Sequence, residues 1–429
     1  MPDTKWFEND RFGMFIHWGL YTIPGGMWKG QRVQRNYSEW LQSSESVPRE
    51  EYRQLAKDFN PTNFDAKAWI REAKMAGMRY FLITAKHHDG FCLWPTKYSD
   101  YNVMEATPFK RDVLGELATA CREEGLKLGF YYSHWMDWDG SGGDVWYLED
   151  SPHSTTPLAK ESCKDSEYRH PTQSEFESYW QKKCLAQIKE LITDYDPDFL
   201  WFDSWGIDSD TYMTEHRQDE LIDLIREQSD RCLVNSRINF NTPSDRCDYL
   251  SMMDNCFPDQ TFEKPWETSG TLNRSWAYHK KDFSWTSTVQ LIKYLVSNAS
   301  LGGNYQLNVG PTPEGEFQPS AIRRLREIGC WLGVNGESVY GTSSSPLPKV
   351  PFGKITFKRQ SGNLIYYIHL WEITPGAAVF IEGLKGQVKE AMVLESGQPV
   401  SCDLVDNGVY ISLPLELEGC VLPVVKMVI

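Results

Sequence analysis

The chain has 429 residues, of which 41% are hydrophobic and 24% charged, and its formal net charge is −15 from 44 basic and 59 acidic side chains. This length accommodates a barrel-sized domain and a smaller one, and the composition is that of a soluble globular protein. An acidic chain without a dense basic run argues against a nucleic-acid partner, and no apolar run approaches the roughly 20 residues of a membrane span.

The ten cysteines are scattered, with no Cys-x-x-Cys pair. This distribution argues against a zinc ribbon or a compact disulfide framework and predicts reduced thiols. The first residues lack the apolar core of a signal peptide. We therefore expect a cytoplasmic protein without a membrane partner, and the sequence leaves open whether it is a homo-oligomer.

Helices and apolar strands alternate through most of the chain. Strand-like runs occupy residues 11–19, 79–85, 127–133, 197–203, 232–237, 249–254 and 304–311. Helical spacing occupies residues 65–77, 111–125, 174–195, 215–229, 287–300 and 319–332. Repeated helix-then-strand units with short connections indicate a parallel sheet, and six or more of them favour a closed barrel.

Two segments do not follow this alternation. Residues 137–171 are rich in Gly, Ser, Pro and Asp and too long for a simple connection, so we expect a rim loop that shapes a site or an interface. Residues 265–278 are rich in Trp, Ser and Thr, and we expect them to be irregular.

The composition changes near residue 340. Short runs that alternate apolar and polar residues, broken by Gly, Pro, Ser and Asn, occupy residues 355–358, 364–369, 378–381 and 409–413. This pattern is typical of a small antiparallel β-sandwich. The sequence therefore predicts an α/β chain, with a (β/α)8-like barrel over residues 1–338 and a C-terminal β-sandwich over residues 339–429.

The strand at residues 197–203 reads PDFLWFD and ends on Asp203. It shows no polar alternation, which suits a parallel strand covered on both faces. Residues at the carboxyl ends of barrel strands build the active site, so Asp203 is a candidate catalytic carboxylate. The alternative is a helix N-cap or a loop acid.

The densest polar cluster, KHHDG, follows the strand at residues 79–85 and contains His87 and His88. Two adjacent histidines and an acid could ligate a metal, but no third histidine stands at a helical or hairpin spacing. Neutral imidazoles both donate and accept hydrogen bonds, which suits the hydroxyls of a sugar. We expect sugar binding and no metal.

Four strings carry a family resemblance: RFGMFIHWG (residues 11–19), TAKHHDGFCLW (84–94), FLWFD (199–203) and LNVGPTPEG (307–315). They resemble, in order, the family 29 glycoside hydrolases, which are α-L-fucosidases. The resemblance covers residues 5 to about 335. It implies a retaining enzyme without a cofactor, built from a barrel and a C-terminal β-sandwich, that acts on a fucosylated glycan.

Carried over residue by residue, the resemblance makes Asp203 the nucleophile, in a Trp-x-Asp pattern with Trp201. The positions that match residues holding the fucose ring are His17, Glu39, Trp40, His87, His88, Tyr131 and Arg237. Arg237 would also help to keep a nearby carboxyl ionised. Trp18, Trp40, Trp201 and Trp276 would pack on the methyl face of the deoxy sugar.

The resemblance assigns the acid/base less directly. Glu267 matches through a glutamate nine residues before Trp276, and Asp254 and Glu263 are nearby alternatives. Glu267 could instead hydrogen-bond the Ser/Thr-rich segment around it. Two other functions remain open at this stage: a fucose-binding protein with weak catalysis, or a retaining hydrolase for a related glycoside such as an α-galactoside.

Overall fold

The computed structural model describes residues 2–33, 37–143, 170–205, 210–372 and 374–429. The predicted rim loop at residues 137–171 is described only at its two ends, and residues 144–169 lie outside the described ranges.

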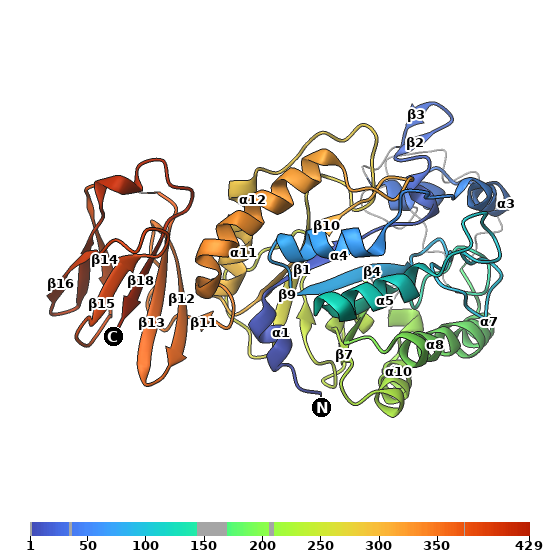
Figure 1. The fold of residues 1–429 in the computed structure, drawn as a ribbon. Helices are drawn as coiled ribbons and strands as arrows, with labels where there is room; N and C mark the ends of the chain where they lie inside the picture. The colour runs from blue at the N-terminus through green and yellow to red at the C-terminus, as the bar shows by residue number, and fades with distance from the viewer. Residues whose placement is uncertain (1, 34–36, 144–169, 206–209, 373) are drawn as a thin grey trace.

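Eight strands form one sheet with the order β7-β6-β5-β4-β1-β10-β9-β8, and every neighbouring pair is parallel (Figure 1). An isolated parallel bridge between Asn235 and Tyr249 joins the two end strands. The predicted TIM-like barrel is therefore confirmed. Its strands are β1 (Phe12–Ile16), β4 (Tyr80–Lys86), β5 (Lys127–Tyr132), β6 (Phe199–Phe202), β7 (Leu233–Val234), β8 (Leu250–Ser251), β9 (Trp266–Thr271) and β10 (Asn304–Val309).

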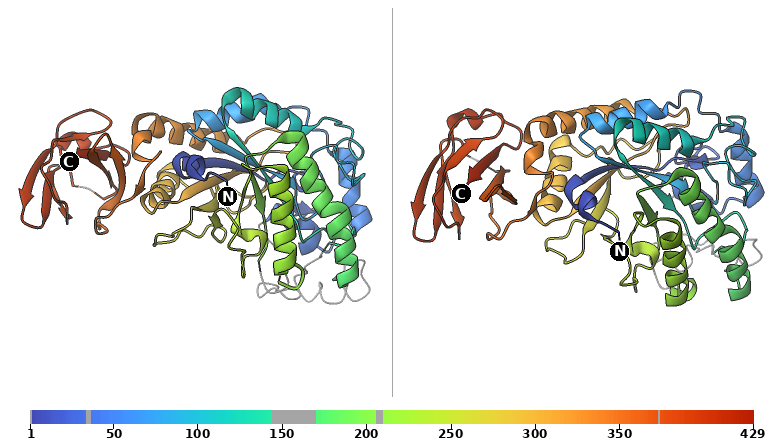
Figure 2. Two further views of the ribbon diagram at one scale, coloured as in Figure 1. Left: turned by 90° about the horizontal axis from the view of Figure 1, so that it is seen from below. Right: turned by 60° about the horizontal axis from the view of Figure 1, so that its bottom comes forward.

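Long helices cover the outside of the barrel (Figure 2). They are α4 (Ala66–Met75), α5 (Val113–Glu124), α7 (Gln173–Tyr179), α8 (Leu185–Tyr195), α10 (Glu215–Gln228), α11 (Thr288–Ser300) and α12 (Pro319–Asn335). Side chains cap the first turns of α4 and α5: Asp65 accepts from Ala68 N, and Asp112 accepts from Gly115 N. Within the described ranges, no helix combines the length and apolar character needed to cross a bilayer.

Short elements fill the connections. They are α1 (Lys5–Asp10), η1 (Leu20–Thr22), β2 (Met27–Trp28), β3 (Gln31–Arg32), η2 (Ser38–Trp40), α2 (Leu41–Ser44), α3 (Arg49–Arg53), η3 (Gln54–Asp58), the π-helical turn η5 (Trp180–Cys184), η6 (Ser236–Ile238), η7 (Gly336–Ser338) and η8 (Leu415–Leu417). The turn η5 joins α7 to α8, so the single helix expected at residues 174–195 is continuous but contains a π-bulge.

Three expectations for the second half of the barrel need correction. Residues 266–271, expected to be irregular, form the fully buried strand β9. The richness in Trp, Ser and Thr suggested an irregular segment, but parallel pairing with β10 and β8 satisfies the backbone hydrogen bonds. The strands expected at residues 232–237 and 249–254 contain only two residues each in the structure. Arg237, expected on the first of them, lies on η6.

Aromatic rings fill the barrel interior. One buried cluster contains Phe15, Tyr80, Tyr131, Phe199 and Trp201. The helix α1 adds Phe7, whose ring lies 4.5 Å from that of Tyr249. The rings of Tyr80 and Phe199 fit because Gly13 and Gly129 face them, where a Cβ atom would collide with the ring.

Residues 343–428 form two antiparallel sheets, which confirms the predicted sandwich (Figure 1). One sheet has the order β11-β12-β13-β18-β15 and the other β14-β17-β16. A separate apolar cluster joins Ile355 and Ile368 of the first sheet to Ile381 and Ile411 of the second. The strands are β11 (Ser343–Ser344), β12 (Gly353–Gln360), β13 (Asn363–Leu370), β14 (Ala378–Glu382), β15 (Glu390–Val393), β16 (Ser401–Val405), β17 (Gly408–Ser412) and β18 (Val424–Val428).

A paired glycine experiment tests the packing of the barrel interior. A Cβ added to Gly129 would lie 2.2 Å from Cζ of Phe199, whereas one added to Gly333 on α12 meets nothing within 4 Å. We expect Gly129→Ala to lower the free energy of unfolding by about 1–3 kcal/mol through overpacking. Gly333→Ala should raise it by about 1 kcal/mol through helix propensity. Denaturant unfolding that showed the same change for both variants would contradict this packing.

Candidate functional site

Polar side chains gather at the edge of the barrel where the strands end. His17 follows β1, His87 and His88 follow β4, and Asp203 follows β6. Tyr131 lies on β5, next to β6 in the sheet. Because the carboxyl ends of parallel strands meet at one rim, residues far apart in sequence come together there.

Asp203 is held by two donors. Its Oδ1 lies 2.5 Å from Nη2 of Arg237, and its Oδ2 accepts a 2.9 Å hydrogen bond from the Tyr131 hydroxyl. Nε2 of His88 lies 3.8 Å from the same Oδ2. The carboxylate is therefore fixed in direction while 12% of its side chain remains exposed.

Arg237 connects two carboxylates. Its Nη2 pairs with Asp203, and its Nη1 pairs with Oδ1 of Asp254 at 2.6 Å. Burial raises the pKa of Asp203 to about 6, against the opposing effect of the Arg237 charge. Burial alone would lower the pKa of Arg237, but Asp203 and Asp254 raise it, so the guanidinium stays charged.

The three histidines are neutral at physiological pH. Burial lowers the pKa of His17 to about 4 and takes the pKa of His87 and His88 well below the ordinary value. Nδ1 of His17 lies 2.7 Å from Oδ1 of Asn308, and Nδ1 of His88 lies 2.6 Å from Oγ of Ser133. Nδ1 of His87 is buried and makes no hydrogen bond within the described part of the chain.

Aromatic rings surround these polar groups. The Trp276 ring lies 5.1 Å from that of His17, and the Trp40 ring lies 5.2 Å from that of His88. Trp205, which the sequence did not single out, lies 5.6 Å from Trp40. Beside Trp40, Glu39 is buried, and its Oε2 accepts a hydrogen bond from the backbone N–H of Ala277. The arrangement offers apolar faces and hydrogen-bonding groups side by side.

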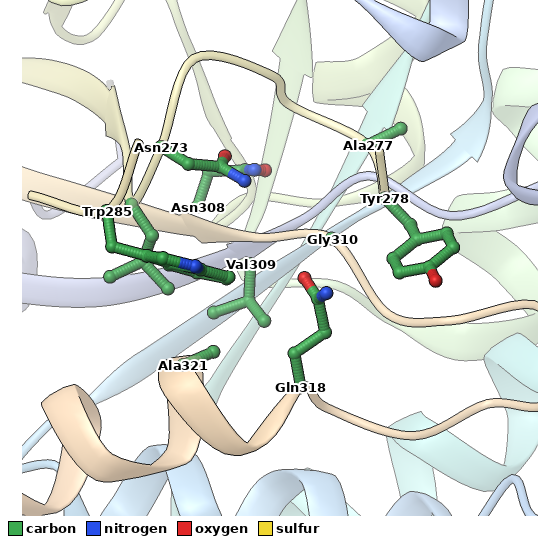
Figure 3. A pocket seen from close by; sticks show the side chains of 10 residues that line it. Asn273, Ala277, Tyr278, Trp285, Asn308, Val309, Gly310, Gln318 and Ala321 are labelled. Atoms are coloured by element: carbon green, nitrogen blue, oxygen red, sulfur yellow. The ribbon is translucent and has the colours of Figure 1, made fainter. Parts of the chain in front are cut away.

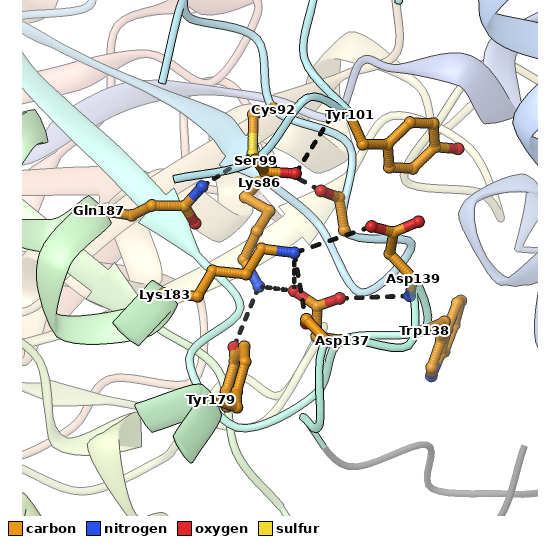
Figure 4. A network of polar contacts seen from close by, with 12 residues as sticks. Lys86, Cys92, Ser99, Tyr101, Asp137, Trp138, Asp139, Tyr179, Lys183 and Gln187 are labelled. Carbon is orange, nitrogen blue, oxygen red and sulfur yellow. Dashed lines mark hydrogen bonds and ion pairs between the residues drawn. The ribbon is translucent and has the colours of Figure 1, made fainter. Parts of the chain in front are cut away.

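A buried ion network begins at Lys86, the residue directly before His87 (Figure 4). Nζ of Lys86 and Nζ of Lys183 each lie 2.9 Å from Oδ2 of Asp137. Burial would raise the pKa of Asp137, but the two lysines lower it below the ordinary value. The network ties the end of β4 to the segment after β5, and the backbone N–H of Trp138 donates to the carbonyl of His88 at 2.7 Å.

A small cavity adjoins Asn308, the partner of His17 (Figure 3). Its volume of about 10 Å³ leaves room for about one water molecule, so it is too small for a sugar. Asn308 Nδ2 also donates to the carbonyl of Trp276 at 2.6 Å. Asn308 therefore couples His17 to the segment that carries Trp276.

The three carboxylates considered for the acid/base lie in different surroundings. Glu267 on β9 has no exposed surface, and its Oε1 accepts from Nε1 of Trp201 at 2.6 Å and from Oγ of Ser251 at 2.7 Å. The Asp254 side chain is 42% exposed and contacts Arg237. Glu263 is exposed in the bend before β9.

Metal ligation finds no support in the side-chain arrangement. Among residues 2–33, 37–143, 170–205, 210–372 and 374–429, no group of three or more His, Cys, Asp or Glu side chains is placed to hold a metal ion. The expectation that no cofactor is needed stays a prediction.

The structure thus brings together His17, Glu39, Trp40, His87, His88, Tyr131, Trp201, Asp203, Arg237 and Trp276, as the sequence suggested. Trp18, also expected to pack on the sugar, instead packs its ring against those of Phe59, Phe64 and Trp69. Sequence reasoning missed Lys86, Asp137 and Asn308. Lysine directly before the double histidine was a usable signal, because a charged residue at the end of a buried strand needs a partner.

Comparisons with known proteins agree with this arrangement. The family model for alpha-L-fucosidase matches residues 1–337. The tissue alpha-L-fucosidase of Bos taurus is 30% identical over 356 residues, which is 80% of this chain and 69% of that protein.

Solved structures extend the likeness to the whole chain. Alpha-L-fucosidase isoenzyme 1 from Paenibacillus thiaminolyticus is 34% identical, with a TM-score of 0.83 over 99% of this chain and 98% of that one. An alpha-L-fucosidase from Bacteroides thetaiotaomicron, trapped as a covalent intermediate with 2-fluoro-fucosyl fluoride, is 31% identical, with a TM-score of 0.83 over 99% of this chain and 95% of that one. The chain therefore belongs to the α-L-fucosidase family of glycoside hydrolases.

Proposed function

We propose that this enzyme removes terminal α-L-fucose from glycans with retention of configuration, using Asp203 as nucleophile and Asp254 as acid/base. The observation that carries this proposal is the single guanidinium of Arg237, which contacts both carboxylates. Retaining glycosidases need two carboxyl groups roughly 5 Å apart. Two acids that bind the two terminal nitrogens of one guanidinium are held on that scale.

In the first half of the reaction, Asp203 attacks the anomeric carbon while the acid protonates the departing oxygen. Arg237 and Tyr131 orient Asp203 by contacting one oxygen each. The carboxylate of Asp203 is therefore already oriented for attack before the covalent bond forms.

In the second half, the acid/base removes a proton from water, which attacks the fucosyl-enzyme. This task requires contact with solvent. Asp254, with 42% of its side chain exposed, meets that requirement, whereas Glu267 has no exposed surface. Glu263 is exposed too, but among the described residues it makes no hydrogen bond or ion pair with Asp203 or Arg237, so Asp254 replaces Glu267 as our candidate.

The remaining side chains fit a deoxy sugar. Neutral His17, His87 and His88 offer both donors and acceptors to hydroxyl groups. Trp40 and Trp276 supply apolar surface for the methyl group. A catalytically weak binding protein is not favoured, because both carboxylates and their shared cation are in place.

We also propose that the enzyme works in a reducing compartment. The described ranges contain nine cysteines, all of them free thiols, and five of these are buried. Stable free thiols are typical of a reducing environment.

The role of Asp203 is tested by removing its carboxylate. Asp203→Ala should lose roughly 10³-fold or more in kcat on an aryl α-L-fucoside, because the covalent route is gone. Azide should restore turnover and yield a fucosyl azide of inverted configuration, since the anion attacks the substrate directly. Circular dichroism checks folding. Wild-type-like turnover would remove Asp203 from this role.

The role of Asp254 appears when two leaving groups are compared. Asp254→Ala should lose about 10²–10⁴-fold on a fucosylated disaccharide, whose leaving group needs a proton. An aryl fucoside with a good leaving group should still form the fucosyl-enzyme, and azide should then give a product of retained configuration. Glu263→Ala is the matched control and should stay close to wild type. Equal losses on both substrates without an azide effect would contradict the assignment.

The acid limb of the pH profile reports the ionisation of Asp203. Because Asp203 must be ionised to attack, kcat/KM should fall as pH drops through about 6, the raised pKa of this group. The hydrogen bond from Tyr131 lowers that pKa, so Tyr131→Phe should move the limb to higher pH. An unmoved limb in Tyr131→Phe would show that another group controls it.

A further inference from the structure

Glu267 lies at the centre of a hydrogen-bond network inside the barrel. Its Oε1 accepts from Trp201 Nε1 at 2.6 Å and from Ser251 Oγ at 2.7 Å. These donors come from β6 and β8, whereas Glu267 itself lies on β9. One carboxylate oxygen therefore connects three strands of the sheet.

The network continues to the peptide next to Asp203. The side-chain amide of Asn235 donates to Ser251 Oγ at 3.2 Å and to the carbonyl of Phe202 at 3.0 Å. The Asn235 side-chain oxygen accepts from the backbone N–H of Phe202 at 2.9 Å. Both the backbone N–H and the carbonyl of Phe202, the residue before Asp203, are thus hydrogen-bonded to Asn235.

The second branch of the network reaches the ligands of Asp203 through Trp201. Tyr131 stacks on the Trp201 ring with a centroid distance of 5.4 Å and an interplanar angle of 22°. The Arg237 guanidinium carbon lies 4.9 Å from the centroid of the same ring. The two groups that hold the Asp203 carboxylate both pack on the indole that Glu267 fixes.

The surroundings of Glu267 argue against a direct role in proton transfer. Burial raises the pKa of Glu267 to about 7, a value that suits a general acid. Yet the side chain has no exposed surface, its Oε1 already accepts two hydrogen bonds, and its Oε2 contacts no hydrogen-bond partner within the described ranges. The raised value follows from burial alone and does not require contact with substrate.

We propose that Glu267 is a positioning residue, which fixes Trp201 directly and Asp203 through Ser251 and Asn235, and which exchanges no proton with the substrate. This inference rests on the proposed reaction at Asp203 and identifies a residue that holds the nucleophile in position.

The test compares two substitutions of the same side chain. Glu267→Gln keeps a carbonyl oxygen that accepts from Trp201 and Ser251, but it cannot act as acid or base. We expect kcat/KM within about threefold of wild type on both an aryl fucoside and a fucosylated disaccharide, with the basic limb of the pH profile unchanged. Loss of more than 100-fold on the disaccharide, relieved on the aryl fucoside, would show that Glu267 is the acid/base and overturn the proposal.

Glu267→Leu removes the acceptor and separates positioning from simple stabilisation. We expect the folded variant to lose about 10- to 100-fold in kcat, equally on both substrates, with no azide acceleration and with the acid limb of the pH profile displaced. Full activity in the folded protein, with only a lower melting temperature, would reduce Glu267 to a stabilising residue and overturn the proposal.

Ser251→Ala provides a milder break in the same network if the leucine variant fails to fold. It removes one donor to Glu267 and the connection to Asn235, and we expect a loss of about three- to tenfold in kcat with KM nearly unchanged. Unchanged kcat would contradict the network. Wild-type turnover of the aryl fucoside, measured in parallel, keeps a failure here distinct from a failure of the proposed function.

Discussion

The site depends on one cation that two carboxylates share. Burial and the nearby charge of Asp254 both raise the pKa of Asp203, whereas the charge of Arg237 lowers it. The two terminal nitrogens of Arg237 contact one acid each. The two acids also differ in exposure, since the side chain of Asp203 is 12% exposed and that of Asp254 is 42% exposed.

The barrel places Arg237 where this is possible. The strand β7 has only two residues, and the chain then turns into η6, which carries Arg237 toward the end of the neighbouring strand β6. A longer β7 would have continued the sheet in place of this turn. The guanidinium packs over Trp201, so its position depends on the barrel interior as well as on its two ion pairs.

A buried ion network lies next to the histidines that we propose to bind the sugar. Lys86 and Lys183 share Asp137, and the charge of Lys86 helps to keep the pKa of His87 and His88 low, after the larger effect of burial. Removing one partner of a buried ion pair costs several kcal/mol. The network therefore contributes both to the stability of the rim and to the neutral state of His87 and His88.

Most of the barrel strands and the site residues that follow them could be predicted from the sequence, because a buried parallel strand appears as a continuous apolar run. The strands that carry His87, His88 and Asp203 were recognisable in this way. The strand β9 was not, since its Glu, Ser, Gly and Thr residues pack inside a barrel and satisfy one another. The place of Asp254 also escaped local patterns, because its partner Arg237 lies 17 positions away in sequence, across a segment whose path only the fold determines.

Covalent labelling of the nucleophile tests the central claim most directly. The enzyme would be incubated with 2-fluoro-fucosyl fluoride, whose fluorine slows both steps while the fluoride leaving group still allows the first, and then digested for peptide mapping by mass spectrometry. We predict one fucosyl label per chain, attached to Asp203. A label on Asp254 or Glu267, or no covalent label during turnover of this reagent, would contradict the account.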